Sequence, residues 1–362
     1  MKYKNSLVIF IPSIERGGVE KNLYYIANFL SKKKINVYVL TAYCDFKRKF
    51  NDSIKFVSLN KYEKTKKSRF FKTLISLFLF TIKFRNKNIT ILSFQSNIAS
   101  IFLSLIYNKK IIIRLNTSTK KYIKGYFKFL IFKLFYNLAN KIILNSYEFK
   151  KEFEKLFLIK VKTIYNPFLK QKPKKIEYQF FNDNNYLKII NVARLTKQKD
   201  HITLLRAFKK LINKRKAKLL IIGTGKEKNN IENYINSNNL TKYVRLIGYK
   251  QNPISYIKLS DVFVLTSSYE GLPNVLLEAQ SQKKYILSSN CSSGPKEILM
   301  NGKYGDLFKV KDDEKLFKLL LNYKKNIKKF KIKALKGYNH LNRFDYKYNL
   351  NKYYNLVVKY LN

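Results

Sequence analysis

Two acidic residues in the segment SSYEGLPNVLLEA, residues 267–279, have a spacing that could serve chemistry. The segment follows an apolar run, and Pro273 suits the first turn of a helix, whose exposed N–H groups attract anions. Glu270 would then lie in the loop and Glu278 inside the helix. Because a carboxylate is a poor neighbour for phosphate, we expect Glu278 to accept from a ribose hydroxyl, and Glu270 from or near a transferred sugar. Two unrelated acids on an exposed helix are the alternative, but only 22 Asp and Glu occur among 362 residues.

A basic pair lies in the segment VARLTKQKDH, residues 192–201, where an apolar run gives way to a loop and then to a helical pattern. Arg194 and Lys199 could converge on a diphosphate at the end of the strand and neutralise the charge that develops on a departing nucleoside diphosphate. The chain contains 74 Lys and Arg, so position rather than charge carries this interpretation. We interpret His201 as lining the following helix rather than as a catalytic group.

Glycines mark several other turns between apolar runs and helical patterns. Gly17 and Gly18 would let the backbone approach a ligand closely at the start of a helix, although an ordinary tight turn is the alternative. A full Rossmann fingerprint is missing. Three softer candidates, each as readily a plain turn, are Gly223-Thr224-Gly225, Gly248-Tyr249 and residues 291–297.

The elements that must position these residues form two series. Short runs rich in Val, Ile and Leu alternate with helical patterns, which indicates parallel sheets covered by helices. The strands predicted in the first half are residues 7–12, 36–41, 54–59, 89–94, 110–115, 141–145 and 162–165, with helices among 19–31, 70–84, 122–140 and 148–156. The second half predicts strands at residues 187–192, 217–222, 244–247, 262–266, 285–288 and 306–310.

The alternation of strand and helix patterns is interrupted over residues 166–185. This segment contains Pro167, Pro173, several Lys and the polar run 182–185. We interpret residues 169–185 as a linker between two doubly wound α/β domains. Such sheets bind ligands beyond the carboxyl ends of their strands, so two of them facing each other would place a reaction in the cleft between.

The formal charge of +52 suggests anionic partners such as phosphates, lipid headgroups or nucleic acid. The alternative explanation of this charge is that AT-rich codons, such as those of Lys and Asn, have drifted into tolerant surface positions. Locally, no Asp or Glu occurs over residues 64–147, which contain 17 Lys and Arg, and Lys120, Lys124 and Lys128 recur at one-turn spacing. Basic, aromatic-rich helices of this kind suit an anionic membrane surface, and a salt-sensitive vesicle-binding assay would test that reading.

Missing patterns exclude other classes of protein. No Asp-x-Asp is present to clamp a divalent cation, and no Walker motif indicates phosphoryl transfer. Cys44 and Cys291 form no Cys-x-x-Cys pair, which favours a reducing, cytoplasmic setting without a cysteine metal site. The longest apolar stretch, residues 74–82, is too short to cross a bilayer, so we expect a soluble or peripheral protein.

Together these residues resemble family 4 of the glycosyltransferases, retaining enzymes of the GT-B fold that include many of bacterial lipopolysaccharide and capsule assembly. The resemblance runs over nearly the whole chain. It rests on five elements in the right order: GGVEK at 17–21, Asn166-Pro167, Arg194 with Lys199, Gly223-x-Gly225, and Glu270 with Glu278. It implies an acceptor domain over residues 1–168, a donor domain over 186–340, and a helix over 341–362 that returns to the first domain.

The resemblance also implies roles for single residues. Arg194, Lys199 and Glu270 would be catalytic, Glu278 would hold the ribose, and Gly17 with Gly18 would close over the donor phosphates. The other donor-binding positions would be Gly271, Leu272, Pro273, Asn274 and Val275 around the sugar, with Gly223 and Tyr249. Many relatives place a His near the sugar where this chain reads IRLNT, residues 113–117, so we expect Arg114 and Asn116 to replace it, facing the cleft.

The activity implied by the resemblance is transfer of a hexose or N-acetylhexosamine from a nucleotide diphosphate sugar, such as a UDP-sugar. The acceptor would be a polysaccharide or a polyprenyl-diphosphate-linked glycan at the cytoplasmic membrane face, with no metal and no cofactor. Two alternatives are a basic nucleic-acid-binding protein and a non-catalytic scaffold of the same fold. The first leaves Glu270 and Glu278 without a role, and a comparison of affinities for a nucleotide sugar and for random duplex would separate them.

Overall fold

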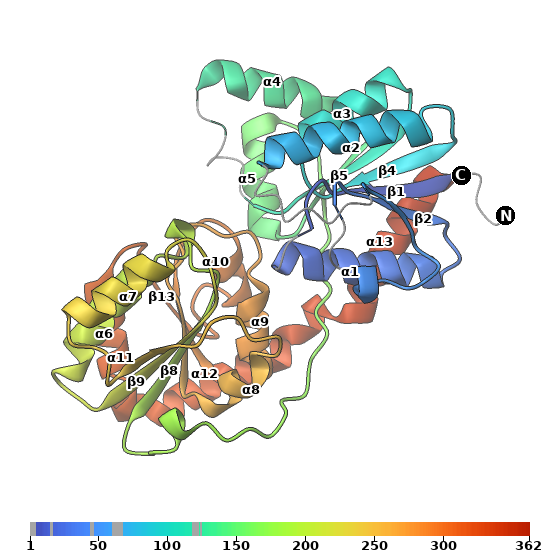
Figure 1. The fold of residues 1–362 in the computed structure, drawn as a ribbon. Helices are drawn as coiled ribbons and strands as arrows, with labels where there is room; N and C mark the ends of the chain where they lie inside the picture. The colour runs from blue at the N-terminus through green and yellow to red at the C-terminus, as the bar shows by residue number, and fades with distance from the viewer. Residues whose placement is uncertain (1–4, 15–16, 44–46, 60–67, 118–122, 124) are drawn as a thin grey trace. The chain divides into compact units, whose positions relative to one another are not determined.

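The computed structural model describes residues 5–14, 17–43, 47–59, 68–117, 123 and 125–362. The chain divides into two compact units. The first contains residues up to Pro167 together with Phe344–Asn362, and the second is the continuous stretch Phe168–Arg343 (Figure 1). None of the helices that the structure describes is long and apolar enough to cross a membrane.

The first unit is built on a parallel sheet of seven strands in the order β3-β2-β1-β4-β5-β6-β7. The change of direction between β1 and β4 is the mark of a doubly wound sheet. The strands are β1 (Ser6–Phe10), β2 (Val37–Leu40), β3 (Lys55–Val57), β4 (Ile89–Ser93), β5 (Lys110–Leu115), β6 (Lys141–Leu144) and β7 (Lys162–Thr163). The helices are α1 (Gly18–Lys32), α2 (Arg69–Phe84), α3 (Asn97–Ile106), α4 (Tyr126–Asn137), α5 (Tyr147–Phe157) and α13 (Tyr346–Leu361).

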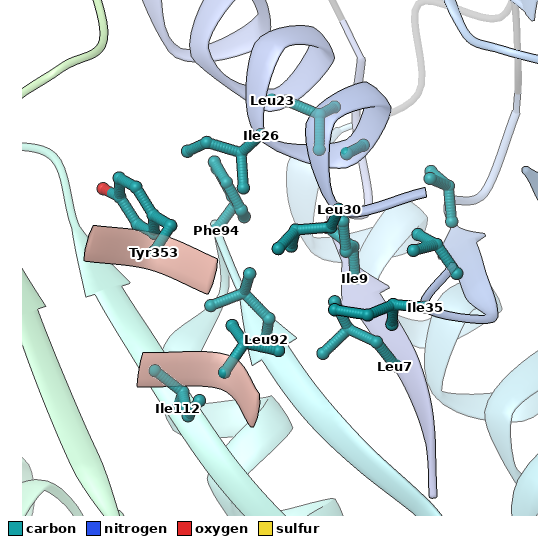
Figure 2. Packing of buried hydrophobic residues seen from close by; sticks show 14 of the residues in the cluster. Leu7, Ile9, Leu23, Ile26, Leu30, Ile35, Leu92, Phe94, Ile112 and Tyr353 are labelled. Carbon is teal, nitrogen blue, oxygen red and sulfur yellow. The ribbon is translucent and has the colours of Figure 1, made fainter. Parts of the chain in front are cut away.

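Alternation along the strands fills two cores, one on each face of this sheet. Leu7 and Ile9 of β1 pack with α1 and α13 in one cluster, which Figure 2 shows from close by. Val8 and Phe10 point the other way, into a cluster with α2 to α5. Because successive side chains of a strand point to opposite faces, a continuous apolar run is what a sheet covered on both faces needs.

The C-terminal helix α13 belongs to the first unit. Its Tyr353 joins the cluster of α1 and β4, the carbonyl of Leu361 accepts from the N–H of Asn5 at 2.9 Å, and the carbonyl of Tyr360 accepts from Thr90 Oγ1 at 2.7 Å. The chain therefore leaves this unit after Pro167 and re-enters it at Phe344.

The second unit has a parallel sheet of six strands in the order β10-β9-β8-β11-β12-β13. The strands are β8 (Leu187–Val192), β9 (Ala217–Ile222), β10 (Val244–Leu246), β11 (Val262–Leu265), β12 (Tyr285–Ser289) and β13 (Asp306–Phe308). The helices are α6 (His201–Ile212), α7 (Lys228–Ser237), α8 (Ile254–Leu259), α9 (Asn274–Ser281), α10 (Gly294–Ile298), α11 (Asp313–Leu321) and α12 (Ile327–Asn339). All thirteen predicted strands are present, and the predicted α/β class with two doubly wound sheets is confirmed.

Residues 169–185 pack against the second unit. The N–H of Lys174 donates to Ser255 Oγ at 2.9 Å, and the ring of Tyr178 lies edge-on to Tyr256 with centroids 5.4 Å apart. The segment thus has fixed contacts with α8 and its surroundings.

Candidate donor-binding site

Three loops meet at the carboxyl edge of the second sheet because their strands are neighbours. The sheet order places β11 between β8 and β12, all parallel. The loops that follow these strands, residues 193–200, 266–273 and 290–293, therefore leave the sheet side by side. Ligands of doubly wound sheets bind at this edge, where the strand order reverses.

The first two loops join Lys199 to Glu270. The Lys199 ammonium makes an ion pair with Glu270 Oε1, and both side chains are largely buried. Ser267 Oγ donates to the same carboxylate oxygen at 2.7 Å. Two of the three residues expected to be catalytic are thus in contact, although 71 positions separate them in the sequence.

Hydrogen bonds to main-chain carbonyls hold these two loops together. Thr266 Oγ1 donates to the carbonyl of Lys199 at 2.9 Å, and Gln198 Nε2 donates to the carbonyl of Tyr269 at 2.8 Å. The N–H of Ser268 donates to the carbonyl of Gln198, also at 2.8 Å. The two loops that carry Lys199 and Glu270 are therefore fixed to each other by hydrogen bonds. Fixed charges of this kind are the preorganisation that electrostatic catalysis requires.

The third loop supports the turn between Glu270 and helix α9. Ser293 Oγ donates to the carbonyl of Glu270 at 2.9 Å, and Ser293 itself has a left-handed backbone, with φ of 73°. Gly294 lies so close to this turn that a Cβ there would be 1.9 Å from the carbonyl oxygen of Gly271 and 2.6 Å from Pro273 Cδ. From the sequence, residues 291–297 are only a weak candidate for a ligand-binding turn. The packing shows that a glycine is needed at position 294 because a side chain there would clash with the Gly271 turn.

The predicted donor loop leads directly into α9. Pro273 precedes the helix and Asn274 is its first residue. Gly271 and Leu272 are buried, and Glu278 of α9 is 9% exposed. Asn274 and Val275 are partly exposed at the start of the helix. Glu278 and Glu270 are thus on either side of the helix start, as the sequence pattern predicts.

Arg194 sits on a loop that glycines allow to pack tightly. A Cβ at Gly223 would lie 1.8 Å from the carbonyl oxygen of Ala193, and one at Gly225 would lie 2.1 Å from that of Leu195. The N–H of Leu195 donates to the carbonyl of Thr224 at 2.9 Å. Gly223 therefore positions the Arg194 loop through its lack of a side chain, and the Arg194 side chain is exposed at this edge.

Burial keeps two titratable groups beside the site uncharged. Burial, with a smaller contribution from the Lys199 charge, lowers the pKa of His201 to about 4. Among the described residues neither ring nitrogen of His201 has a hydrogen-bond partner. Burial also raises the pKa of Cys291 to about 12, with a smaller contribution from Glu270, so this thiol stays protonated near neutral pH.

The other predicted site residues belong to the first unit or follow β10 of the second. Gly17 and Gly18 are exposed at the start of α1 in the first unit, where a Cβ on Gly17 would lie 2.8 Å from Glu20 Oε2. Tyr249 is exposed just after β10 of the second unit, and the carbonyl of the preceding Gly248 accepts from Gly223 at 2.9 Å.

Arg114 points into the interior of the first unit. Its Nε donates to Tyr353 Oη at 2.8 Å and its Nη2 donates to Asn166 Oδ1 at 2.5 Å, while the guanidinium lies over the ring of Phe94. The side chain is fully buried, which does not fit the expectation that it faces the cleft from a strand end. Asn116 is partly buried and donates to the carbonyl of Phe94 at 2.9 Å. In the described structure Arg114 ties β5 to α13 and to Asn166, near the point where the chain first leaves this unit.

The comparisons with known proteins agree with this architecture. The family description "Glycosyltransferase Family 4" matches residues 16–168, and "Glycosyl transferases group 1" matches residues 173–334. An uncharacterized glycosyltransferase of Methanocaldococcus jannaschii is 36% identical over 198 residues, which are 51% of this chain and 48% of that protein.

A second relative is the N-acetylgalactosamine-N,N'-diacetylbacillosaminyl-diphospho-undecaprenol 4-alpha-N-acetylgalactosaminyltransferase of Campylobacter jejuni, 33% identical over 40% of each chain. The matches thus span less than half of these two curated relatives. Among solved structures, Anabaena HepE in complex with UDP and glucose superimposes with a TM-score of 0.79 at 16% identity, covering 98% of this chain and 100% of that one. That likeness establishes the GT-B fold. With two sheets of this topology and two consecutive family matches that together run from residue 16 to 334, the chain belongs to the family 4 glycosyltransferases.

Proposed function

We propose that this glycosyltransferase moves a hexose or N-acetylhexosamine from a UDP-sugar to a lipid-linked or polysaccharide glycan. The observation that carries the proposal is the convergence of Lys199, Glu270 and the start of α9 at the carboxyl edge of the second sheet. HepE, solved with UDP and glucose, supports the nucleotide, and the Campylobacter relative, whose name specifies a diphospho-undecaprenol acceptor, supports the lipid carrier.

In the proposed reaction the bond between the anomeric carbon and the diphosphate oxygen breaks while the acceptor oxygen bonds to the same carbon. The acceptor proton passes to the leaving phosphate on the same face, so the anomeric configuration is retained. Arg194 and Lys199 neutralise the charge that grows on the diphosphate, which is the task a metal ion performs in other transferases. No metal or cofactor is required in this proposal.

Glu270 has two tasks in the proposed mechanism. It holds the Lys199 ammonium at the sheet edge before the donor arrives, and it accepts from a hydroxyl of the donor sugar when phosphate competes for that ammonium. Glu278 accepts from the ribose. The loop of Gly271, Leu272 and Pro273, fixed by Ser293 and Gly294, would surround the sugar.

The direct test is a nucleotide-release assay of the purified protein with a panel of UDP- and GDP-sugars and lipid-linked acceptors. We expect turnover with a UDP-sugar, and a loss of roughly 10²–10³ in kcat for Arg194→Ala or Lys199→Ala, the size found when a preorganised charge-stabilising donor is removed. Lys197→Ala, an exposed cation of the same loop, is the matched control and should retain activity. Near-normal rates in both site variants would refute the assigned site.

The proposal also covers the location of the enzyme, the stereochemistry of transfer and its independence from metal ions. We propose that the enzyme meets its lipid-linked acceptor at the cytoplasmic face of a membrane, as a peripheral protein. Analysis of the product anomer by NMR tests retention, and activity in the presence of a chelator tests independence from metal ions. An inverted product, or loss of activity that added Mg²⁺ restores, would contradict these two parts.

A further inference from the structure

Helix α2 turns its large apolar side chains outward. Phe70, Leu74, Phe78 and Ile82 recur every fourth residue and are between 45% and 72% exposed. Residues spaced by four lie on one face of a helix, so these four form a continuous outer stripe. Isolated exposed apolar residues are ordinary, but a stripe of this length is not.

The inner face of α2 carries hydroxyl groups among its apolar residues. Thr73 and Ser76 are buried against the unit, and their hydroxyls donate to the carbonyls of Arg69 at 2.9 Å and of Lys72 at 3.0 Å. The helix therefore buries two hydroxyl groups, satisfied by its own backbone, beside Phe80 and Phe84, and still leaves a second apolar stripe outward. An amphipathic helix whose outer face lies in water instead carries polar side chains on that face.

The two neighbouring helices repeat the pattern. On α3, Ser100 and Ser104 are buried while three apolar side chains are about half exposed: Phe102, Leu105 and Ile106. On α4 and its C-terminal cap the exposed residues are Tyr126, Phe127, Leu130, Leu134 and Leu138. Of 21 large apolar side chains exposed in the described part of the chain, 13 lie between Phe70 and Leu138, so the pattern is local.

These helices lie next to one another on the same face of the first sheet. Helix α3 contacts both α2 and α4, and Figure 1 shows the three together on the side of the sheet opposite α1 and α13. We call the exposed apolar residues of α2, α3 and α4, with the cations among them, the α2–α4 surface.

The charge of the α2–α4 surface has one sign. Arg69, Lys83, Arg85, Lys87 and Lys128 are exposed, and residues 64–147 contain no carboxylate. Lys120 and Lys124, which the sequence pattern also assigned to this surface, lie outside the described residues. An anionic partner complements these cations, whereas a second copy of this surface would oppose them with like charges.

We infer that the α2–α4 surface docks on an anionic lipid bilayer, with its aromatic and aliphatic side chains at the boundary of headgroups and acyl chains. The cations at its rim would lie near the headgroup phosphates. This inference rests on the proposed function for its setting, a membrane that carries the acceptor, and adds the surface that would bind it.

Flotation of the full chain with vesicles tests the inference. We expect binding to equimolar phosphatidylglycerol and phosphatidylcholine at low salt, and little binding to pure phosphatidylcholine or at high salt. The double variant Phe78→Ser with Ile82→Ser should weaken binding by at least about tenfold. The triple variant Lys83→Gln, Arg85→Gln and Lys87→Gln should weaken it on the order of a hundredfold.

Helix α12 of the second unit provides matched controls. Ile332→Ser with Leu335→Ser removes two apolar residues that are about half exposed, and Lys328→Gln, Lys329→Gln and Lys331→Gln remove three exposed cations. Both controls should bind vesicles as the wild type does. Equal losses in the control and surface variants would overturn the inference.

Two further measurements separate the remaining outcomes. Calorimetric UDP binding by the surface variants should equal that of the wild type, which shows that they are folded. If the wild type binds anionic vesicles but does not bind UDP, the proposed function is wrong and the inferred membrane-binding surface still stands. If the wild type does not bind anionic vesicles, and the Phe78 and Ile82 variant dissociates a dimer seen by sedimentation, the surface is a subunit contact and the inference is wrong.

Discussion

Replacing Gly294 by alanine tests the packing of the candidate site most directly. The added Cβ would lie 1.9 Å from the Gly271 carbonyl oxygen, and ordinary contact begins at 3.4 Å. One of the two loops must therefore move by about 1.5 Å, the difference of these values. Both neighbours are backbone or proline ring, which cannot rotate away. Overpacking of this kind costs about 1–3 kcal/mol, and a displacement near 1 Å of positioned groups costs roughly 10²-fold in rate.

We expect Gly294→Ala to lower kcat in the nucleotide-release assay about 10²-fold and to lower the Tm of the second unit by roughly 3–10 °C. Gly302→Ala is the control, because Gly302 has a φ of 93° but its added Cβ would meet nothing closer than 3.7 Å. That variant carries backbone strain without a clash near the site, so it should lose stability and keep its rate. Equal rates in the two variants would refute the packing of Gly294 on the Gly271 turn.

Three other substitutions address single residues. Glu278→Gln should weaken UDP binding by about 10–100-fold, the loss of one charged hydrogen bond, without changing the affinity for inorganic pyrophosphate; equal effects on both ligands, measured by calorimetry, would argue against a ribose contact. Tyr353→Phe should destabilise the first unit by about 1–3 kcal/mol in urea unfolding because it leaves the buried Arg114 Nε unpaired, and Tyr348→Phe, at an exposed ring, should change little. The neutral His201 of the folded chain resists protonation down to a pKa of about 4, while the unfolded chain takes up a proton near 6.5, so stability falls as the pH drops through that window. Between pH 7 and 5 the loss should be about 2 kcal/mol, and His201→Leu should abolish it; an unchanged slope would place the titration elsewhere.

The sheets could be predicted from the sequence because their strands are buried on both faces. Continuous apolar runs such as residues 187–192 and 262–266 need no tertiary information to be recognised. The sequence pattern does not predict helix α3, and the composition of this helix explains why. It buries Ser100 and Ser104 and exposes Phe102, which inverts the pattern by which a helix is recognised.

The candidate site could be predicted only in part. Lys199 and Glu270 were singled out because each follows a strand, but their contact depends on β8 lying next to β11, which no local pattern reveals. The expectation that Arg114 faces the cleft is not supported, because its side chain is buried against Tyr353. The sequence could not show this, since Tyr353 is 239 positions away. Tertiary pairing of this kind leaves no signal in a single sequence.

The re-entry of the chain into the first unit at Phe344 has a consequence for the order of synthesis. The second unit is one continuous stretch, so it can be completed on the ribosome before α13 exists. Until then Leu7, Leu92 and Ile112 lack α13, one of the two helices that pack on their side of the sheet. Domains made first usually fold first, but here the core on one face of the N-terminal sheet stays incomplete until α13 is made. We therefore expect chaperones to bind the nascent first unit. We also expect variants of α13 to be degraded by proteases rather than to accumulate as folded but inactive protein.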